Sequence, residues 1–108
     1  MKRAAAARCL AELGNLTRLD IYRLLVRAGP KGLIITRLQT RLDVPLSTLT
    51  FHLRGLVNAG LVSQEKVGRE VTCRAVYQQL DTLIDFLREE CCKGFEDEAS
   101  TLPVRRAS

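Results

Sequence analysis

The 108-residue sequence predicts a mainly α-helical domain with one small β-hairpin, an α+β arrangement in the order α-α-α-α-β-β-α. Two observations lead to this prediction. Apolar residues recur at helical spacing through the first sixty residues, and the pattern then changes to alternation in "LVSQEKV" and "EVTCRAVY". Glycines and a proline divide the helical part into four segments. A second stretch of helical spacing follows the hairpin and predicts the last helix.

The first two helices have clear boundary signals. A helix over 3–13 is rich in Ala and Leu and stops at Gly14. A helix over 15–29 begins at Asn15 as a candidate N-cap and ends at Gly29, which Pro30 follows. Its apolar residues cover much of its circumference, so we expect it to be central and mostly buried.

The remaining elements follow from a turn, a change of period and a final glycine. "DVP" separates a short helix over 35–42 from a helix over 46–60, since proline disfavours helical backbone at the residue before it. Gly68 lies in the turn of the hairpin. The last helix is expected over 79–93. These elements predict a domain over 1–94 and a flexible tail over 95–108.

Charge is unevenly distributed along the chain. The net charge is +5, but residues 1–80 carry thirteen Lys/Arg and five Asp/Glu, so this part alone is strongly basic. A basic body favours a polyanion such as nucleic acid as the partner. No stretch approaches the ~20 apolar residues of a membrane span, so no membrane partner is expected. Without a signal-peptide pattern, the cytoplasm is the expected location, where thiols stay reduced.

The helix over 46–60 has two separate faces. Leu residues and Val57 form an apolar stripe that is expected to enter the core, and they are Leu46, Leu49, Leu53, Leu56 and Val57. A second face has hydroxyl groups, an arginine, an amide and an aromatic ring, in Ser47, Thr50, Phe51, Arg54 and Asn58, with Thr48 and His52 beside it. Hydroxyls and arginine suit phosphate oxygens and base edges. The plainer alternative is an ordinary amphipathic helix, with His52 at the edge of the core.

A short helix, a tight turn and a second helix form a helix-turn-helix, and the hairpin after it forms a wing. Arg37 and Arg41 add positive charge to the short helix, and Lys66 and Arg69 add it to the tip of the wing. These residues are therefore candidate DNA contacts. A winged helix that serves only in protein interaction is the other class to consider. No pattern typical of an enzyme site is present, so catalysis is not expected.

Three segments together resemble the arsenic-repressor (ArsR/SmtB) family. "LGNLTRLDIYRLL" (13–25) is similar to the signature of its second helix, "LSTLTFHLRGLVNAGLV" (46–62) to its recognition helix, and "VGREVTCRAVY" to its wing. The resemblance covers roughly residues 10–90. It implies a homodimeric repressor that pairs through its first and last helices, binds an imperfect palindrome in double-stranded DNA and releases it when an inducer binds. No cofactor is required.

The family senses different inducers at different positions, so the ligands must be sought in this chain. The family's metal box on the third helix corresponds to "GLIITRL" (32–38), with Ile34 and Thr36 where the family has cysteines. The last helix carries no histidine, so zinc or nickel sensing is not expected. The ending "EECCKG" (89–94) resembles a branch that senses As(III) or Sb(III) through C-terminal cysteines. In that branch a third cysteine often follows, where this chain has Glu98.

Cys91 and Cys92 are therefore the candidate inducer site. Soft thiolates select thiophilic ions, and a monosubstituted organoarsenical(III) such as methylarsenite needs only two of them. Cys73 or Cys9 is a possible third ligand, which would allow inorganic As(III) or Sb(III). Core packing alone is the simpler role for Cys9, for Cys73 and, on the apolar stripe of the last helix, for Cys91. A repressor that senses thiol oxidation or persulfide is the alternative function.

Overall fold

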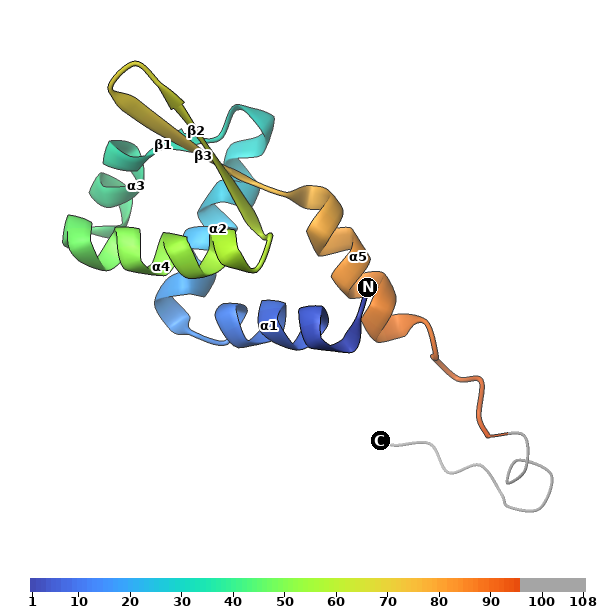
Figure 1. Ribbon diagram of the computed structural model, residues 1–108. Helices are drawn as coiled ribbons and strands as arrows, with labels where there is room; N and C mark the ends of the chain where they lie inside the picture. Colours follow the sequence, from blue (N-terminus) through green and yellow to red (C-terminus); the bar gives the residue numbers. More distant parts are fainter. Residues whose placement is uncertain (96–108) are drawn as a thin grey trace.

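The computed structural model describes residues 1–95, which form five α-helices and a three-stranded antiparallel sheet (Figure 1). The predicted α+β winged helix-turn-helix is confirmed. In chain order the elements are α1 (Arg3–Leu13), α2 (Leu16–Ala28), the 3₁₀ turn η1 (Gly29–Lys31), β1 (Leu33–Ile34), α3 (Ile35–Leu42), α4 (Leu46–Asn58), β2 (Val62–Val67), β3 (Glu70–Ala75) and α5 (Tyr77–Arg88). Among the described residues, no helix combines the length and apolar character needed to cross a membrane.

The ends of α2 follow the predicted capping chemistry. The side chain of Asn15 accepts a hydrogen bond from the backbone N–H of Arg18 at 3.0 Å, which satisfies one free donor of the first turn. Gly29 ends the helix with φ +77°, a conformation that a side chain would disfavour. Ile21, Tyr22 and Leu25 are buried, so α2 is central as expected.

The sheet contains one strand that the sequence did not reveal. The strand order is β1-β3-β2, and Leu33 and Ile34 of β1 pair with Cys73 and Thr72 of β3. Two residues are too few to show an alternating pattern. The signal that was present is Gly32, which has φ +69° and lies so close to the Cys73 carbonyl that a Cβ atom would collide with it.

The helix-turn-helix is formed by α3 and α4. Asp43 ends α3 in the left-handed conformation with φ +53°, and Pro45 precedes α4. Leu49, Leu53 and Leu56 of α4 are buried as predicted, but Leu46 is 49% exposed. The prediction that Leu46 enters the core is wrong because the first turn of α4 extends past the core. The helix ends at Asn58, two residues before the expected Gly60.

The last helix is shorter than predicted. It spans Tyr77–Arg88, not 79–93, and the chain continues in turns past Glu89. Leu83 is buried, but Leu87 is 57% exposed, so α5 leaves the core before its end. Helical residues without tertiary packing have little to hold them, and the acidic Glu89 and Glu90 oppose the helix dipole at a C-terminus. Cys91 is therefore exposed and does not continue an apolar stripe.

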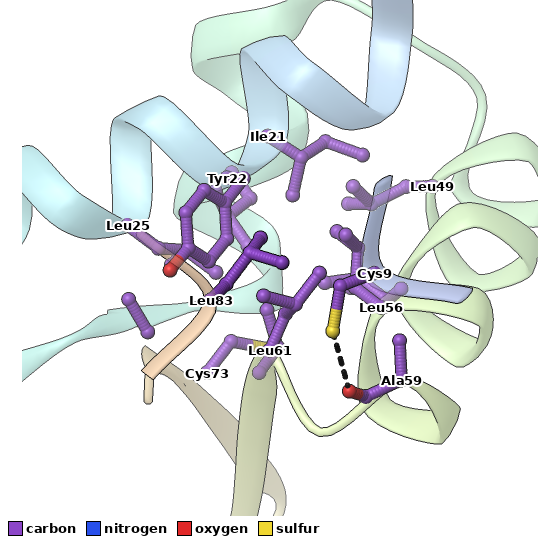
Figure 2. Packing of buried hydrophobic residues seen from close by; sticks show 14 of the residues in the cluster. Cys9, Ile21, Tyr22, Leu25, Leu49, Leu56, Ala59, Leu61, Cys73 and Leu83 are labelled. Carbon is purple, nitrogen blue, oxygen red and sulfur yellow. Dashed lines mark hydrogen bonds between the residues drawn. The ribbon is translucent and has the colours of Figure 1, made fainter. Parts of the chain in front are cut away.

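The core joins α1, α2, α4, β3 and α5 (Figure 2). Cys9 of α1 is fully buried, and its thiol donates a hydrogen bond to the carbonyl of Ala59, at the end of α4, at 3.4 Å. Figure 1 shows α5 beside the N-terminal part of α1, on the side of the molecule away from α3. The residues that face solvent on α3, α4 and the wing are thus separated from the α1–α5 end.

Candidate nucleic-acid interface and thiol site

The side of α4 opposite its buried leucines carries the predicted contact residues. We call Ser47, Thr50, Phe51, Arg54 and Asn58 the polar face of α4. Ser47, Phe51, Arg54 and Asn58 are exposed and Thr50 is half-buried. No Asp or Glu occurs anywhere in α4. The helix therefore offers donors and one cation to a partner and places no negative charge against it.

Two predicted contact residues, Thr50 and His52, are partly engaged in contacts within the protein. The Thr50 hydroxyl lies within hydrogen-bonding distance of the carbonyls of Leu46 at 3.0 Å and Ser47 at 3.1 Å, so its proton is donated back to the helix. His52 is half-buried, its Nδ1 atom is buried without a partner, and its ring packs edge-on to Phe51 with centroids 5.4 Å apart. His52 thus sits at the edge of the core, and Thr48 beside it is half-buried.

Positive charge surrounds the polar face of α4. Arg37 and Arg41 of α3 are exposed and border one shallow hollow with Thr36 and Thr40. Lys66 and Arg69 are exposed at the tip of the hairpin. Within residues 1–95 none of these four cations forms an ion pair, since the observed pairs are Arg18–Glu12, Arg74–Glu65 and Lys93–Glu90. They are free to bind phosphate groups.

The start of α4 and the wing meet at a second hollow, of about 270 Å³. Leu46 and Thr50 of α4, Arg69 of the wing and residues at the start of α3 line it. The fold therefore brings Arg69 next to the polar face of α4, as a winged helix-turn-helix requires. Of the predicted DNA contacts, Thr50 of α4 and Arg69 of the wing therefore border the same hollow.

The four cysteines fall into two pairs with different surroundings. All four are free thiols, with Cys9 and Cys73 buried and Cys91 and Cys92 exposed. Burial raises the pKa of the Cys73 thiol, and a hydrogen bond from Gln64 Nε2 at 3.5 Å partly opposes this. Cys9 is held by Ala59 and by Gln79 Nε2, which donates to its sulfur at 3.5 Å. Both buried thiols are packed as small core residues.

The exposed pair lies just after α5. The backbone N–H of Cys91 donates to the carbonyl of Arg88 at 2.7 Å, and Cys92 has φ +66°. A hydrogen bond with the Cys92 side chain is the main cause that raises the pKa of the Cys91 thiol above its usual value, with a smaller contribution from desolvation. Cys91 therefore favours its protonated form.

Within residues 1–95 of one protomer, the structure does not bring a third ligand to this pair. Over residues 1–95, no group of three or more His, Cys, Asp or Glu side chains is arranged to hold a metal ion. Cys9 and Cys73 are enclosed in the core, and Glu98, at the position of the missing third cysteine, lies outside the described residues. Cys91 and Cys92 are thus the accessible thiols of the described chain.

Sequence reasoning missed two contacts that fasten α4 to the other end of the molecule. Gln79 of α5 donates to the Ala59 carbonyl at 3.0 Å, and the Glu12 carboxylate of α1 lies against Gly55 in the middle of α4. Glu12 also pairs with Arg18 at 3.0 Å. A glycine inside a helix was the one available signal, because it often marks a close approach. Nothing in the sequence singled out Gln79.

Together the short helix, the recognition helix and the wing define a winged helix-turn-helix, a class of DNA-binding domain. Comparison with known families matches residues 13–65 to a family described as a helix-turn-helix domain. An ArsR-like transcriptional regulator from Rhodococcus sp. RHA1 is 31% identical, with a TM-score of 0.76 over 90% of this chain and 89% of that one. This chain belongs to the ArsR family of transcriptional regulators.

Two further solved structures are similar. HlyU from Vibrio cholerae N16961 is 27% identical, with a TM-score of 0.67 over 86% of this chain and 100% of that one. A homodimeric winged helix-turn-helix DNA-binding domain from Mycobacterium bovis, 22% identical with a TM-score of 0.65 over 83% of each chain, shares the fold. No curated protein matches this chain.

Proposed function

We propose that this regulator is a homodimeric repressor that binds an imperfect palindromic operator and releases it when a trivalent arsenical binds Cys91 and Cys92. The observation that carries the proposal is that Cys91 and Cys92 are adjacent, exposed and free thiols. No other described residues offer two accessible thiols. The ArsR family and the cationic surface around α4 support the DNA-binding half of the proposal.

Exposed apolar residues at the α1–α5 end support the homodimer. Leu10 of α1 is 44% exposed, and Ile84 and Leu87 of α5 are 40% and 57% exposed. Exposed apolar side chains on the two helices that the family resemblance assigns to the dimer interface would gain from being covered by a partner. A second copy would cover them, and the similar domain from Mycobacterium bovis is described as homodimeric. Pairing would set two recognition helices about 34 Å apart, one turn of DNA.

The chemistry at the thiol pair requires no redox partner. Methylarsenite, CH₃As(OH)₂, would react with the two S–H groups to form two As–S bonds, and each hydroxyl would leave with a thiol proton as water. The As–C bond remains intact, so two As–S bonds complete the three-coordinate shell of the arsenic. Inorganic As(III) or Sb(III) would need a third thiolate.

A binding event after α5 has a physical route to α4. Gln79 of α5 and Cys9 of α1 both contact the carbonyl of Ala59, at the end of α4. An arsenical that reorders the turn after Arg88 would shift α5 against α1. Because α4 is held by the same two elements, the recognition helices of a dimer would change their relative position. That change would weaken simultaneous contact with two half-sites.

The test is DNA release in cysteine variants. We expect Cys91→Ser/Cys92→Ser protein to bind operator as tightly as the wild type and to keep it when methylarsenite is added. Cys73→Ala is the matched control, and it should still release DNA with methylarsenite. Mass spectrometry should find one CH₃As group per protomer in the wild type and in Cys73→Ala. Release of DNA from the double-serine variant would overturn the assignment of the site.

A further inference from the structure

The polar face of α4 contains one residue that solvation does not explain. Phe51 is 64% exposed, although its neighbours along this face are Ser47, Arg54 and Asn58. A single exposed apolar residue is ordinary on a protein surface. Phe51, however, lies in the middle of a helix face that otherwise presents hydrogen-bond donors to a polyanion. Its ring would be matched by an apolar group on the partner.

The surroundings of Phe51 add to its apolar character. The Thr50 hydroxyl is bonded back to the carbonyls of Leu46 and Ser47, which leaves the Thr50 methyl as the part without a polar partner. Leu46, 49% exposed, and Thr50 both line the hollow that reaches Arg69. The first half of α4 is thus less polar than its sequence indicates.

The ring of Phe51 has a supported orientation. His52 packs against it edge-on, with the ring planes at 70°, and His52 itself is half-buried. A side chain held in this way loses little further freedom on binding. Phe51 also lies on the helix-turn-helix, whereas α5 lies on the side of the molecule away from α3 (Figure 1). A dimer formed through α1 and α5 would leave Phe51 uncovered.

In the major groove the C5-methyl of thymine is the apolar group on the base edges. We propose that Phe51 contacts the methyl group of a thymine in each operator half-site, so that Phe51 determines sequence specificity. The inference rests on the proposed DNA binding through α4. Arg54 lies three residues further along, about 4.5 Å of helix rise. One base step is about 3.4 Å, so this thymine should lie one or two base pairs from the position that Arg54 contacts.

The experiment removes single methyl groups from the DNA. An operator is first selected from random double-stranded DNA with the wild-type protein. Each thymine of a half-site is then replaced in turn by deoxyuridine, which differs only in the C5-methyl. A buried methyl contributes about 0.8 kcal/mol, which corresponds to a fourfold change in affinity. We expect one thymine per half-site whose replacement weakens wild-type binding about fourfold, with the other positions nearly unchanged.

The protein variants assign that effect. In Phe51→Ala the affinity should fall, and thymine and deoxyuridine should bind equally at the sensitive position. Arg54→Ala is the control, because it should bind more weakly overall and still distinguish the two bases. If no thymine is sensitive, or if Phe51→Ala remains sensitive at that position, the inference is wrong although DNA binding stands. If the wild type selects no DNA sequence, the proposed function itself fails.

Discussion

Two tyrosine hydroxyls in this small core have opposite environments. The Tyr22 side chain is 4% exposed, and its hydroxyl is buried without a hydrogen-bond partner. Burial is the main cause that raises the pKa of Tyr22 to about 12, with added repulsion from Cys9, Tyr77 and Asp81. The Tyr77 hydroxyl lies 3.5 and 3.4 Å from the carbonyls of Leu25 and Val26, to which it donates. An unpaired buried hydroxyl costs stability, whereas a paired one contributes to it.

Tyr22→Phe is therefore expected to leave the free energy of unfolding unchanged or to raise it. Tyr77→Phe, the matched control, should lower it by about 0.5–1.5 kcal/mol. The folded state favours protonated Tyr22, so the free energy of unfolding does not depend on this group below pH 10. It falls as the pH rises from 10 toward 12, because the unfolded state then releases the Tyr22 proton more readily than the folded state. By pH 11 the wild type should lose about 1 kcal/mol relative to Tyr22→Phe. Urea denaturation at pH 7 and 11 measures this, and a large loss in Tyr22→Phe at pH 7 would contradict it.

At the level of elements, we expect α3 and the wing to contact phosphate groups and α4 to contact bases. Arg37 and Lys66 are exposed and free of ion pairs within the described chain, and Arg54 is the one cation on the polar face of α4. Phosphate contacts release counterions and so depend steeply on salt. A base contact acts mainly on sequence discrimination. The two kinds of contact can be separated by measurement.

Arg37→Ala and Lys66→Ala should each lower the slope of log affinity against log salt by about 0.9 per protomer, or about 1.8 for the dimer, with the preferred sequence unchanged. Arg54→Ala should cost about 1–3 kcal/mol and relax the preference at one base position. Glu89→Gln, just after α5, serves as the control and should change neither quantity. Operator binding measured from 50 to 300 mM salt provides the slopes. Unchanged affinity in Arg54→Ala would instead favour a domain that binds proteins.

The sequence predicted the elements whose signals are local and missed what depends on tertiary contact. Asn15, Gly29 and Pro45 marked boundaries that the structure confirms, because caps and proline act within one turn. β1 was missed since its two residues are a strand only by pairing with β3. The sequence predicts an α5 that continues to residue 93, because the helical spacing of apolar residues continues past Arg88, where the helix ends in the structure.

The candidate sites show the same division. The polar face of α4 follows from helical period alone, and its exposure agrees with the structure. Three features depend on distances that no sequence pattern contains. They are the hydrogen bond from the Thr50 hydroxyl to its own helix, the burial of His52 Nδ1 and the hydrogen bond from Gln79 to the Ala59 carbonyl. The sequence alone identifies Cys91 and Cys92 as an unusual adjacent pair. Their exposure depends on the end of α5 at Arg88, which the sequence does not predict.

The whole molecule places DNA contacts and thiols at opposite ends. α3, α4 and the wing form one end, and α5 leads to Cys91 and Cys92 at the other (Figure 1). In the proposed mechanism an inducer at the thiols would therefore act at a distance from the DNA contacts. Its effect would pass through α1 and α5, which hold the end of α4 at Ala59. The central claim is thus a coupling between a two-thiol site and a distant DNA surface.

Fluorescence anisotropy of labelled operator DNA bound by the reduced wild-type protein tests this coupling most directly. Methylarsenite, arsenite, antimonite, zinc and peroxide are titrated in parallel. Methylarsenite should release the DNA at the lowest concentration, with release complete at one equivalent per protomer, and zinc should release none. Release by peroxide or zinc with no response to any arsenical would contradict it.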